Sequence, residues 1–556
     1  MSGIVLTTIN AKWTHPSLAL RLLKANLGSL ESQCEIIEFA LRQPLCEKTA
    51  PLLAARPRIL GVSVSIWNHL ATIELLEALE KEWKKREEGL TKNTKEEKNT
   101  KEDLGRPIVV LGGPEVSYLP DDADIFKFAD YVIRGEGEMA FRALCEIVFQ
   151  RENEIFSAGT QTPAGSGWLA AIDARFGVAA SAIQPYVAGR ALRTRANHFI
   201  SKLQDNLTEI KTGYHFYTDE DIAQKLIYVE ASRGCPFECE FCLSAVKTEE
   251  RGGAVREFQL EQFLADMEIL VNRGVRTFKF LDRTFNANIS RAVKICEFFL
   301  RKLEERGRER FAPFVVHFEM VPSLFPRELC EILARFPPDS LRLEIGIQTL
   351  NPEVCARIHR PGWRNQSIDP EKELEVIRFL RKKTNAIIHV DLIAGLPGED
   401  LQSFGRGFDR LWQAVCEEGK EKREKRKVKS EEGEVKSEGR EKRGEKKSRV
   451  EIQLGILKLL PGAPISRHNE TFGMRYNCKP PYEIEETSSI SENDLKRVKN
   501  FAAFWERLVN RGLLHIEGEL VFEKFMALSD SLLAHFGKNW GIDKNELIKK
   551  ATDLSL

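Results

Sequence analysis

Short apolar runs alternate with segments of helical periodicity in two long series, and this alternation is the strongest constraint on the fold. In the first series, runs at 3–10, 58–68 and 107–117 are apolar along most of their length, and amphipathic segments such as 69–83 separate them. Strands of this kind are buried on both faces, and helical connections make neighbouring strands parallel. The first series therefore predicts an α/β domain in which helices cover both faces of a parallel sheet.

The second series begins near residue 225 and contains about six strand-like runs, each followed by a helix or a loop. These runs lie at 225–232, 276–286, 314–320, 340–350, 386–399 and 450–464. A closed parallel βα barrel has about eight strands. We therefore expect an open, partial (βα)6 barrel, with its chemistry at the C-terminal ends of the strands.

Changes of composition divide the chain into four predicted parts. We expect an α/β domain at 1–150, a linker at 151–222, the barrel at 223–464 and a mainly helical C-terminal domain at 465–556. Two nearly apolar-free segments, 84–106 and 417–448, mix charges of both signs, which is typical of solvated insertions. The aromatic residues of the C-terminal helices recur at helical spacing and are expected to form a core.

The charge balance and the cysteine usage limit the cellular setting. Lys+Arg and Asp+Glu both number 83, so the formal net charge of zero gives no electrostatic reason to expect a nucleic acid or a membrane surface as partner. The first residues lack the pattern of a signal peptide, and no run reaches about 18–20 apolar residues. Eleven cysteines, an odd number, indicate a reducing cytoplasm rather than a disulfide framework.

Three cysteines gather in "RGCPFECEFC" (233–242), at Cys235, Cys239 and Cys242. A structural zinc site needs four ligands, and no fourth cysteine or histidine follows closely. A four-iron cluster held by three thiolates keeps one iron open, and an open position can bind a chelating substrate. Zinc with a remote fourth ligand and structural thiols remain alternatives.

The C-x3-C-x2-C spacing, with Phe241 just before the third cysteine, resembles the radical S-adenosylmethionine (SAM) superfamily. The resemblance implies a [4Fe-4S] cluster whose open iron binds SAM and which, once reduced, cleaves SAM to methionine and a 5′-deoxyadenosyl radical. It also implies a reducing partner such as flavodoxin or ferredoxin. The motif follows an apolar run at 225–231, where the first barrel strand of that superfamily is expected.

Polar residues at the later strand ends extend the resemblance. Glu319, Gln348, Arg360 and Asp391 look like the SAM contacts of the branch that includes oxygen-independent coproporphyrinogen oxidases, although each could instead be a satisfied barrel-end group. Many members carry a Gly-Gly-Glu type motif after the second strand, whereas this chain has "FLDRTFN". The resemblance therefore assigns Asp282 to the SAM amino group.

The N-terminal α/β domain resembles the Rossmann-like cobalamin-binding domains of the same superfamily. Ser63, in "SVS" (63–65) after the strand that starts at 58, and Gly112 and Gly113 in "LGGPEVS" (111–117) stand where such domains approach the corrin. Many cobalamin proteins carry an Asp-x-His-x-x-Gly motif whose histidine binds cobalt. His15 lacks those neighbours, so we expect cobalamin to bind without a protein imidazole ligand.

Taken together, the resemblance implies a cobalamin-dependent radical SAM enzyme that methylates an unactivated carbon. A radical cyclase, rearrangement or oxidation enzyme that uses cobalamin without methyl transfer is an alternative, and so is a cobalamin- or SAM-binding protein without turnover. No motif states the substrate, so a lipid, a small metabolite, a peptide and an RNA base all remain open.

Overall fold

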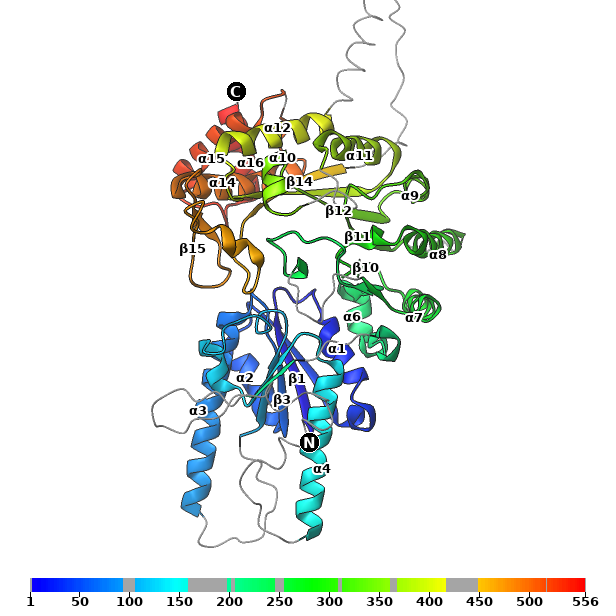
Figure 1. Ribbon diagram of the computed structural model, residues 1–556, viewed down its shortest axis with the longest axis vertical. Helices are drawn as coiled ribbons and strands as arrows, with labels where there is room; N and C mark the ends of the chain where they lie inside the picture. Colours follow the sequence, from blue (N-terminus) through cyan, green and yellow to red (C-terminus); the bar gives the residue numbers. More distant parts are fainter. Residues whose placement is uncertain are drawn as a thin grey trace, which may run out of the picture. The chain divides into compact units, whose positions relative to one another are not determined.

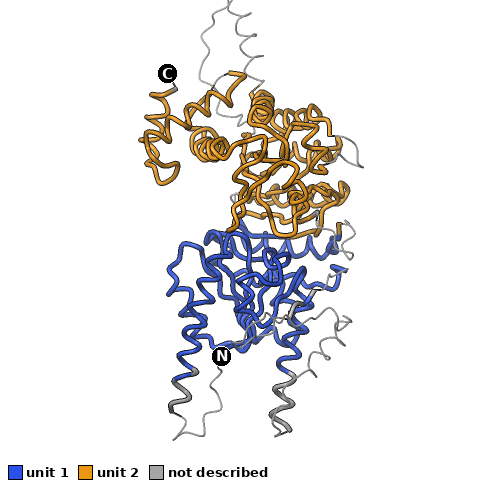
Figure 2. The backbone as a smooth tube through the Cα atoms, turned by 60° about the vertical axis from the view of Figure 1, so that its left-hand side comes forward, with its two compact units in different colours: residues 1–229, 256–276 blue, residues 230–255, 277–556 orange. Residues whose placement is uncertain are grey.

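The computed structural model describes residues 3–93, 106–158, 198–201, 206–245, 255–308, 313–360, 368–416, 449–516 and 518–555. The insertion expected at 417–448 lies outside the described residues, as do 94–105 of the insertion expected at 84–106. The described chain forms two compact units, residues 1–229 with 256–276 and residues 230–255 with 277–556 (Figure 2). No helix in the described ranges is long and apolar enough to cross a membrane.

The sheet of the first unit has the strand order β2-β1-β3-β4-β5-β6, and every neighbouring pair is parallel (Figure 1). The strands are β1 (Ile4–Asn10), β2 (Cys34–Ala40), β3 (Ile59–Ser63), β4 (Ile108–Gly112), β5 (Tyr131–Arg134) and β6 (His198–Ser201). The first five strands follow the doubly wound 2-1-3-4-5 order. In this order β2 is added on one side of β1 and β3 on the other, and this reversal of the strand order leaves a crevice for a ligand at the carboxyl ends of β1 and β3.

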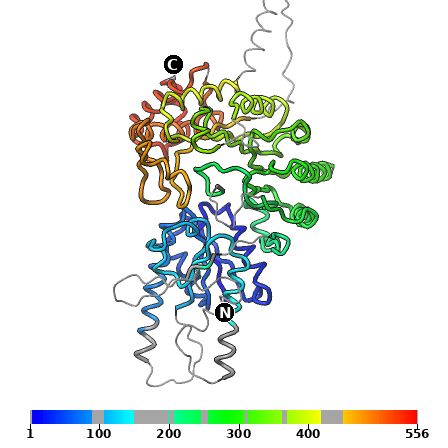
Figure 3. The backbone as a smooth tube through the Cα atoms, viewed as in Figure 1, coloured from blue at the N-terminus to red at the C-terminus, as the bar shows by residue number. Residues whose placement is uncertain are grey.

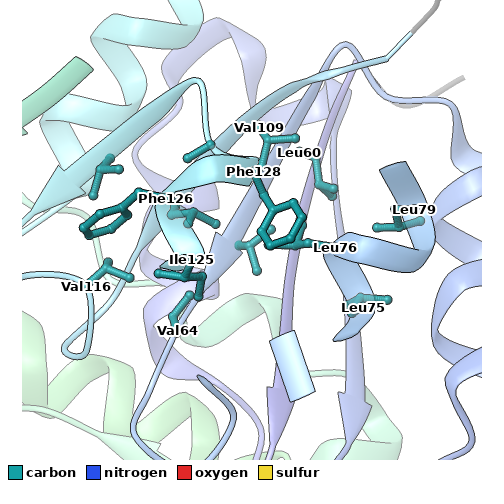
Figure 4. Packing of buried hydrophobic residues seen from close by; sticks show 14 of the residues in the cluster. Leu60, Val64, Leu75, Leu76, Leu79, Val109, Val116, Ile125, Phe126 and Phe128 are labelled. Carbon is teal, nitrogen blue, oxygen red and sulfur yellow. The ribbon is translucent and has the colours of Figure 1, made fainter. Parts of the chain in front are cut away.

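Helices cover both faces of this sheet, as the continuous apolar strands predict. They are α1 (Leu18–Ala25), α2 (Leu45–Ala55), α3 (His69–Asn93) and α4 (Glu138–Ala158). Val5 and Ile9 of β1 pack with α2 and α3 in one core cluster, and Figure 4 shows Leu75, Leu76 and Leu79 of α3 in the same cluster. Ile4 and Leu6 pack with α1 and α4 in the other. Successive β1 side chains therefore enter opposite cores, so the strand has no solvent-facing side.

The first unit also includes residues downstream of the expected 1–150 domain. Buried Arg21 of α1 binds Glu38 (2.8 Å) and Asp221 of α6 (Asp219–Gln224; 2.7 Å). Thr212 donates a hydrogen bond to Asp266 of α7 (Leu260–Asn272; 2.7 Å). These contacts fold the described end of the expected linker, and a segment expected in the barrel, onto the first unit.

The second unit contains a parallel sheet with strands in the order β14-β13-β12-β11-β10. The strands are β10 (Thr277–Phe280), β11 (Val315–Met320), β12 (Leu341–Gln348), β13 (Ile387–Ala394) and β14 (Arg449–Ile456). The intervening helices are α8 (Ile289–Arg308), α9 (Arg327–Leu333), α10 (Pro352–Arg357), α11 (Pro370–Lys383) and α12 (Leu401–Cys416). The remaining expected strand forms as β7 (Ile227–Val229), directly ahead of the cysteine segment.

The two faces of this second sheet differ in chemistry. Val316, Phe318 and Met320 of β11 are buried among apolar side chains, whereas the alternating residues His317 and Glu319 are only partly buried. The same alternation continues along β12 and β13. One face of the sheet therefore packs on helices, and the other presents polar side chains.

The C-terminal segment is mainly helical, with α14 (Glu492–Trp505), α15 (Phe522–Phe536) and α16 (Lys544–Ser555) after a short hairpin of β15 (Arg475–Tyr476) and β16 (Ile484–Glu486). Figure 3 follows this segment from orange to red beside α12. Phe408 of α12 packs against Phe501 and Trp505 with ring centroids 5.2 and 4.9 Å apart. The expected aromatic core therefore joins α12 to the C-terminal helices.

Candidate functional site

The three cysteines of the motif, Cys235, Cys239 and Cys242, lie in one loop of the second unit, after β8 (Ser232–Arg233). Each is partly buried. The amide of Cys242 donates a hydrogen bond to the carbonyl of Cys239 (3.0 Å), so a tight turn joins the second and third cysteines. Cys235 Sγ lies 3.2 Å from Thr284 Oγ1, and the amide of Ser244 donates to Cys242 Sγ (3.4 Å).

The electrostatics of the loop suit a cationic group. Burial raises the pKa of the Cys239 thiol to about 12 and also raises the pKa of Cys235. After burial, the charge of Cys242 also raises both pKa values, so the three thiols are within electrostatic reach of one another. Thiolates that are costly to form in a bare protein are stabilised by metal coordination.

The described residues do not form a site for a single metal ion. Among the described residues, no group of three or more Cys, His, Asp or Glu side chains is arranged to hold one metal ion. In an iron–sulfur cluster each thiolate binds a different iron, so the sulfur atoms need not converge on one point. The donor set of three neighbouring thiols fits such a cluster.

Asp282 supports the start of the cysteine loop. Its side chain is 2% exposed, and its carboxylate accepts hydrogen bonds from the amide of Ala231 (2.9 Å) and from the hydroxyl of Ser232 (2.5 Å). Burial raises its pKa to about 6, against the lowering effect of these bonds. The residue expected to hold the SAM amino group therefore also fixes the chain just before Cys235.

Carboxylates from three adjacent strands line the polar face of the second sheet. Glu319 of β11 lies opposite Glu344 of β12, and Asp391 of β13 lies opposite Gly346. Lys279 Nζ lies 3.4 Å, and His317 Nε2 3.2 Å, from Glu344 Oε2. Two of these carboxylates, Glu319 and Asp391, are residues that the sequence singled out, and the parallel register brings them onto one face.

The pKa values of these carboxylates diverge. Burial, followed by the charge of Glu344, raises the pKa values of Glu319 and Asp391 to about 7. Burial also disfavours the charged form of Glu344, but contacts with His317 and Lys279 lower its pKa to about 2. The face therefore holds one firmly charged carboxylate and two carboxyl groups that either donate or accept a proton near neutral pH.

Gln348 and Arg360 lie near the carboxyl end of β12. Gln348 adopts a positive φ of 69° next to an irregularity in the β12–β13 register. Arg360 is 6% exposed and donates to the carbonyl of Gly346 (2.6 Å), and it pairs with buried Glu373 of α11 (3.2 Å). Its guanidinium thus has partners within the fold, while its charge is also felt at Cys239. Phe241, half-buried, lies within the cysteine loop.

The first unit places the three residues expected near the corrin at the carboxyl ends of β3 and β4. Ser63 ends β3, and Gly112 ends β4 directly opposite it. Gly113 has φ 104°, and a Cβ there would lie 2.5 Å from the Val64 carbonyl oxygen. A Cβ on Gly112 would meet only one atom within 4 Å, the Ile133 carbonyl oxygen at 3.7 Å. Small residues thus leave the backbone accessible at this edge, next to the point where the strand order reverses.

Sequence reasoning missed Asn68, which ties the loops of this edge together. Its Oδ1 accepts from the amide of Ser65 (2.8 Å), and its Nδ2 donates to the carbonyl of Ile9 (3.0 Å). Trp67, the residue before it, is 51% exposed. The signal available in the sequence was a tryptophan next to an asparagine in the short segment between β3 and α3, although an asparagine directly before a helix usually indicates an N-cap.

Two histidines of the first unit are paired within it. His69 Nδ1 lies 2.8 Å from Glu115 Oε1, and this buried pair links the start of α3 to the loop after β4. His15 Nδ1 lies 2.5 Å from the hydroxyl of Tyr228. The expectation that His15 is not a cobalt ligand stays a prediction, and the structure gives this imidazole a protein partner.

Parts of the chain are similar in sequence to known proteins. Residues 229–411 match the radical SAM superfamily. The chain is 24% identical to the cobalamin-dependent radical SAM methyltransferase TokK of Streptomyces tokunonensis over 321 residues, 57% of this chain and 42% of that protein. It is 28% identical to an uncharacterized methyltransferase of Pyrococcus horikoshii over 194 residues, 34% of this chain and 36% of that protein. The matches thus span less than half the length of these curated relatives.

A solved structure has a similar fold. The cobalamin-dependent S-adenosylmethionine radical enzyme OxsB, solved with aqua-cobalamin bound, matches with a TM-score of 0.59 over 99% of this chain and 75% of that chain. The sequence identity in this match is 15%. At this identity the likeness establishes the fold: an α/β unit with a Rossmann-like parallel sheet and a unit built on a partial βα barrel.

Proposed function

We propose, from the premise that residues 229–411 are a radical SAM domain, that this chain is a cobalamin-dependent radical SAM enzyme that methylates an unactivated carbon of its substrate. The observation that carries the proposal is the loop of three neighbouring, partly buried thiols next to a sheet face of titrating carboxylates. When bound, the cluster with SAM supplies a 5′-deoxyadenosyl radical, and cobalamin supplies a methyl group.

The cysteine loop is the proposed holder of the cluster. Cys235, Cys239 and Cys242 would each bind one iron, which leaves the fourth iron for the amino and carboxylate groups of SAM. Thr284, within 3.2 Å of Cys235 Sγ, would hold a sulfur ligand in place by hydrogen bonding. Such bonds from surrounding residues orient ligands and tune the metal group.

The polar sheet face is the proposed seat of SAM. Glu319 and Asp391 present carboxyl groups on neighbouring strand ends, where they would accept hydrogen bonds from ribose hydroxyls. A cationic sulfonium nearby would favour their ionised forms, because it offsets the repulsion from Glu344. The contacts of Arg360 with Glu373 and with the carbonyl of Gly346 would hold its guanidinium in place. Its positive charge would then favour the thiolate form of Cys239.

The carboxyl edge of the first sheet is the proposed seat of cobalamin. Ser63, Gly112 and Gly113 have small side chains or none at this edge, beside the point where the strand order reverses, so a large flat ring could approach the backbone. The exposed indole of Trp67 would offer an apolar surface to the ring. Asn68 would keep this edge in place by its bonds to Ile9 of β1 and to Ser65, which follows β3.

Anaerobic reconstitution tests the proposal in two stages. The protein should bind about four irons and four sulfides, and replacing all three cysteines by alanine should abolish this binding. With SAM, a chemical reductant and bound cobalamin, a methyltransferase should form S-adenosylhomocysteine and methylate cobalamin. Release of 5′-deoxyadenosine without any methylated cobalamin would favour a cyclase, rearrangement or oxidation enzyme instead.

A further inference from the structure

One buried carboxylate lies inside the cysteine loop. Glu240 follows Cys239 directly, and its side chain is 3% exposed. Three basic or imidazole side chains surround it: Arg467 Nη2 lies 2.6 Å and His359 Nδ1 3.1 Å from Oε1, and His468 Nε2 lies 2.7 Å from Oε2. An ordinary ion pair has one partner, whereas three side chains hold this carboxylate.

The backbone of Glu240 is held as firmly as its side chain. Its amide donates to the carbonyl of Ile358 (3.0 Å), and its carbonyl accepts from the amide of Ile465 (3.0 Å). Ile465, Arg467 and His468 belong to the short 3-10 helix Pro464–His468, which follows the sheet of the second unit. Segments more than a hundred residues away in sequence thus fix the position between the second and third cysteines.

Glu240 and Arg467 differ in their exposure to solvent. The Glu240 carboxylate is buried, whereas the Arg467 side chain is half exposed and always charged. Screening by solvent weakens the field of an exposed charge more than that of a buried one. The pair therefore places a buried carboxylate on the residue directly after Cys239, and the positive charge that pairs with it is half exposed to water.

We propose that Glu240 and Arg467 are positioning residues that set the reduction potential of the cluster. The inference rests on the proposed function, since it needs a cluster on the three cysteines. Net charge, hydrogen bonding and solvent exposure around the sulfur ligands determine the potential of iron–sulfur clusters. A buried carboxylate disfavours the more negative reduced form, and the guanidinium partly offsets that effect.

Two single variants and their combination test the proposal in the full-length reconstituted protein. Glu240→Gln keeps the side-chain size but removes the negative charge, so the midpoint potential should rise. Arg467→Gln removes the compensating charge, so the potential should fall. We expect each change to alter the equilibrium constant for reduction about tenfold, which is about 59 mV for one electron. The double variant should return toward the wild-type value.

A matched control separates local charge from loop damage. Glu238→Gln removes the same charge from an exposed position in the same loop, and should shift the potential far less. Iron content and a potentiometric titration followed by electron paramagnetic resonance supply the readouts. Shifts of the two single variants in the same direction, or no shift in either, would overturn the inference.

The outcomes also separate this inference from the proposed function. If Glu240→Gln fails to retain iron, Arg467→Gln still decides, because a lowered potential supports the inference and an unchanged one overturns it. If the wild-type protein binds no cluster, the proposed function itself fails. If the wild-type protein binds a cluster and neither single variant changes its midpoint potential, only the proposed role of Glu240 and Arg467 fails.

Discussion

Replacing Asp391 by asparagine tests the electrostatics of the polar sheet face. Burial, together with the charges of Glu344 and Glu319, raises the pKa of Asp391 from 3.8 to about 7. The folded protein therefore holds this proton more tightly than the unfolded chain does. Holding this proton stabilises the folded protein. That contribution to the free energy of unfolding is fully present below about pH 4 and is lost as the pH rises through about 7.

The magnitude follows from the size of that rise. Each pKa unit corresponds to about 1.4 kcal/mol, so ionising Asp391 costs the folded protein about 4 kcal/mol at pH 8. Asparagine keeps the shape of the side chain and cannot ionise. Asp391→Asn should therefore be more stable than wild type at pH 8 by up to about 4 kcal/mol, and the two proteins should converge near pH 4.

Urea unfolding of the ligand-free protein at pH 4.5 and pH 8, followed by a fluorescence signal, measures the difference. The matched control is Glu375→Gln, an exposed carboxyl on α11, whose free energy of unfolding should differ from wild type equally at both pH values. If the stability difference between Asp391→Asn and wild type is the same at both pH values, the electrostatic reasoning is refuted.

SAM binding by Asp391→Ala should be weaker by about 10–150-fold, since a hydrogen bond to a charged group is lost.

Three further outcomes are expected. Arg360→Ala should destabilise the protein by about 3–5 kcal/mol, because it leaves Glu373 buried without its partner; equal urea midpoints for variant and wild type would contradict this. Gly113→Ala should weaken hydroxocobalamin binding, measured by equilibrium dialysis, because a Cβ would push against Val64; unchanged affinity would argue against this edge as the corrin seat. Deleting 420–447 should leave the melting temperature and SAM cleavage nearly unchanged, and a large drop in either would reveal a role for that segment.

The spacing of residues along the chain was sufficient to predict the main elements. Apolar runs and helical periodicity depend on neighbours a few positions away, so they indicate strands and helices without knowledge of the fold. The cysteine spacing is local in the same sense, and it identified the candidate cluster ligands. Glu319 and Asp391 could be placed together because parallel strands bring their carboxyl ends to one edge.

Contacts between distant segments could not be predicted in this way. Arg21 binds Asp221, 200 residues away, so the end of the expected linker belongs to the first unit. No local pattern marks Asp221 as a partner, because surface helices commonly begin with acidic residues. The boundary between the units was therefore decided by tertiary packing.

The surroundings of each site residue were also decided by tertiary structure. Glu240 and His468 are 228 positions apart, and nothing near Glu240 in sequence predicts that its carboxylate is buried between an arginine and two histidines. The sequence determined which groups can bind a metal or accept a proton, because that depends on side-chain chemistry. Folding decided how strongly each group holds its charge, because burial and the distance to other charges exist only once the chain has packed.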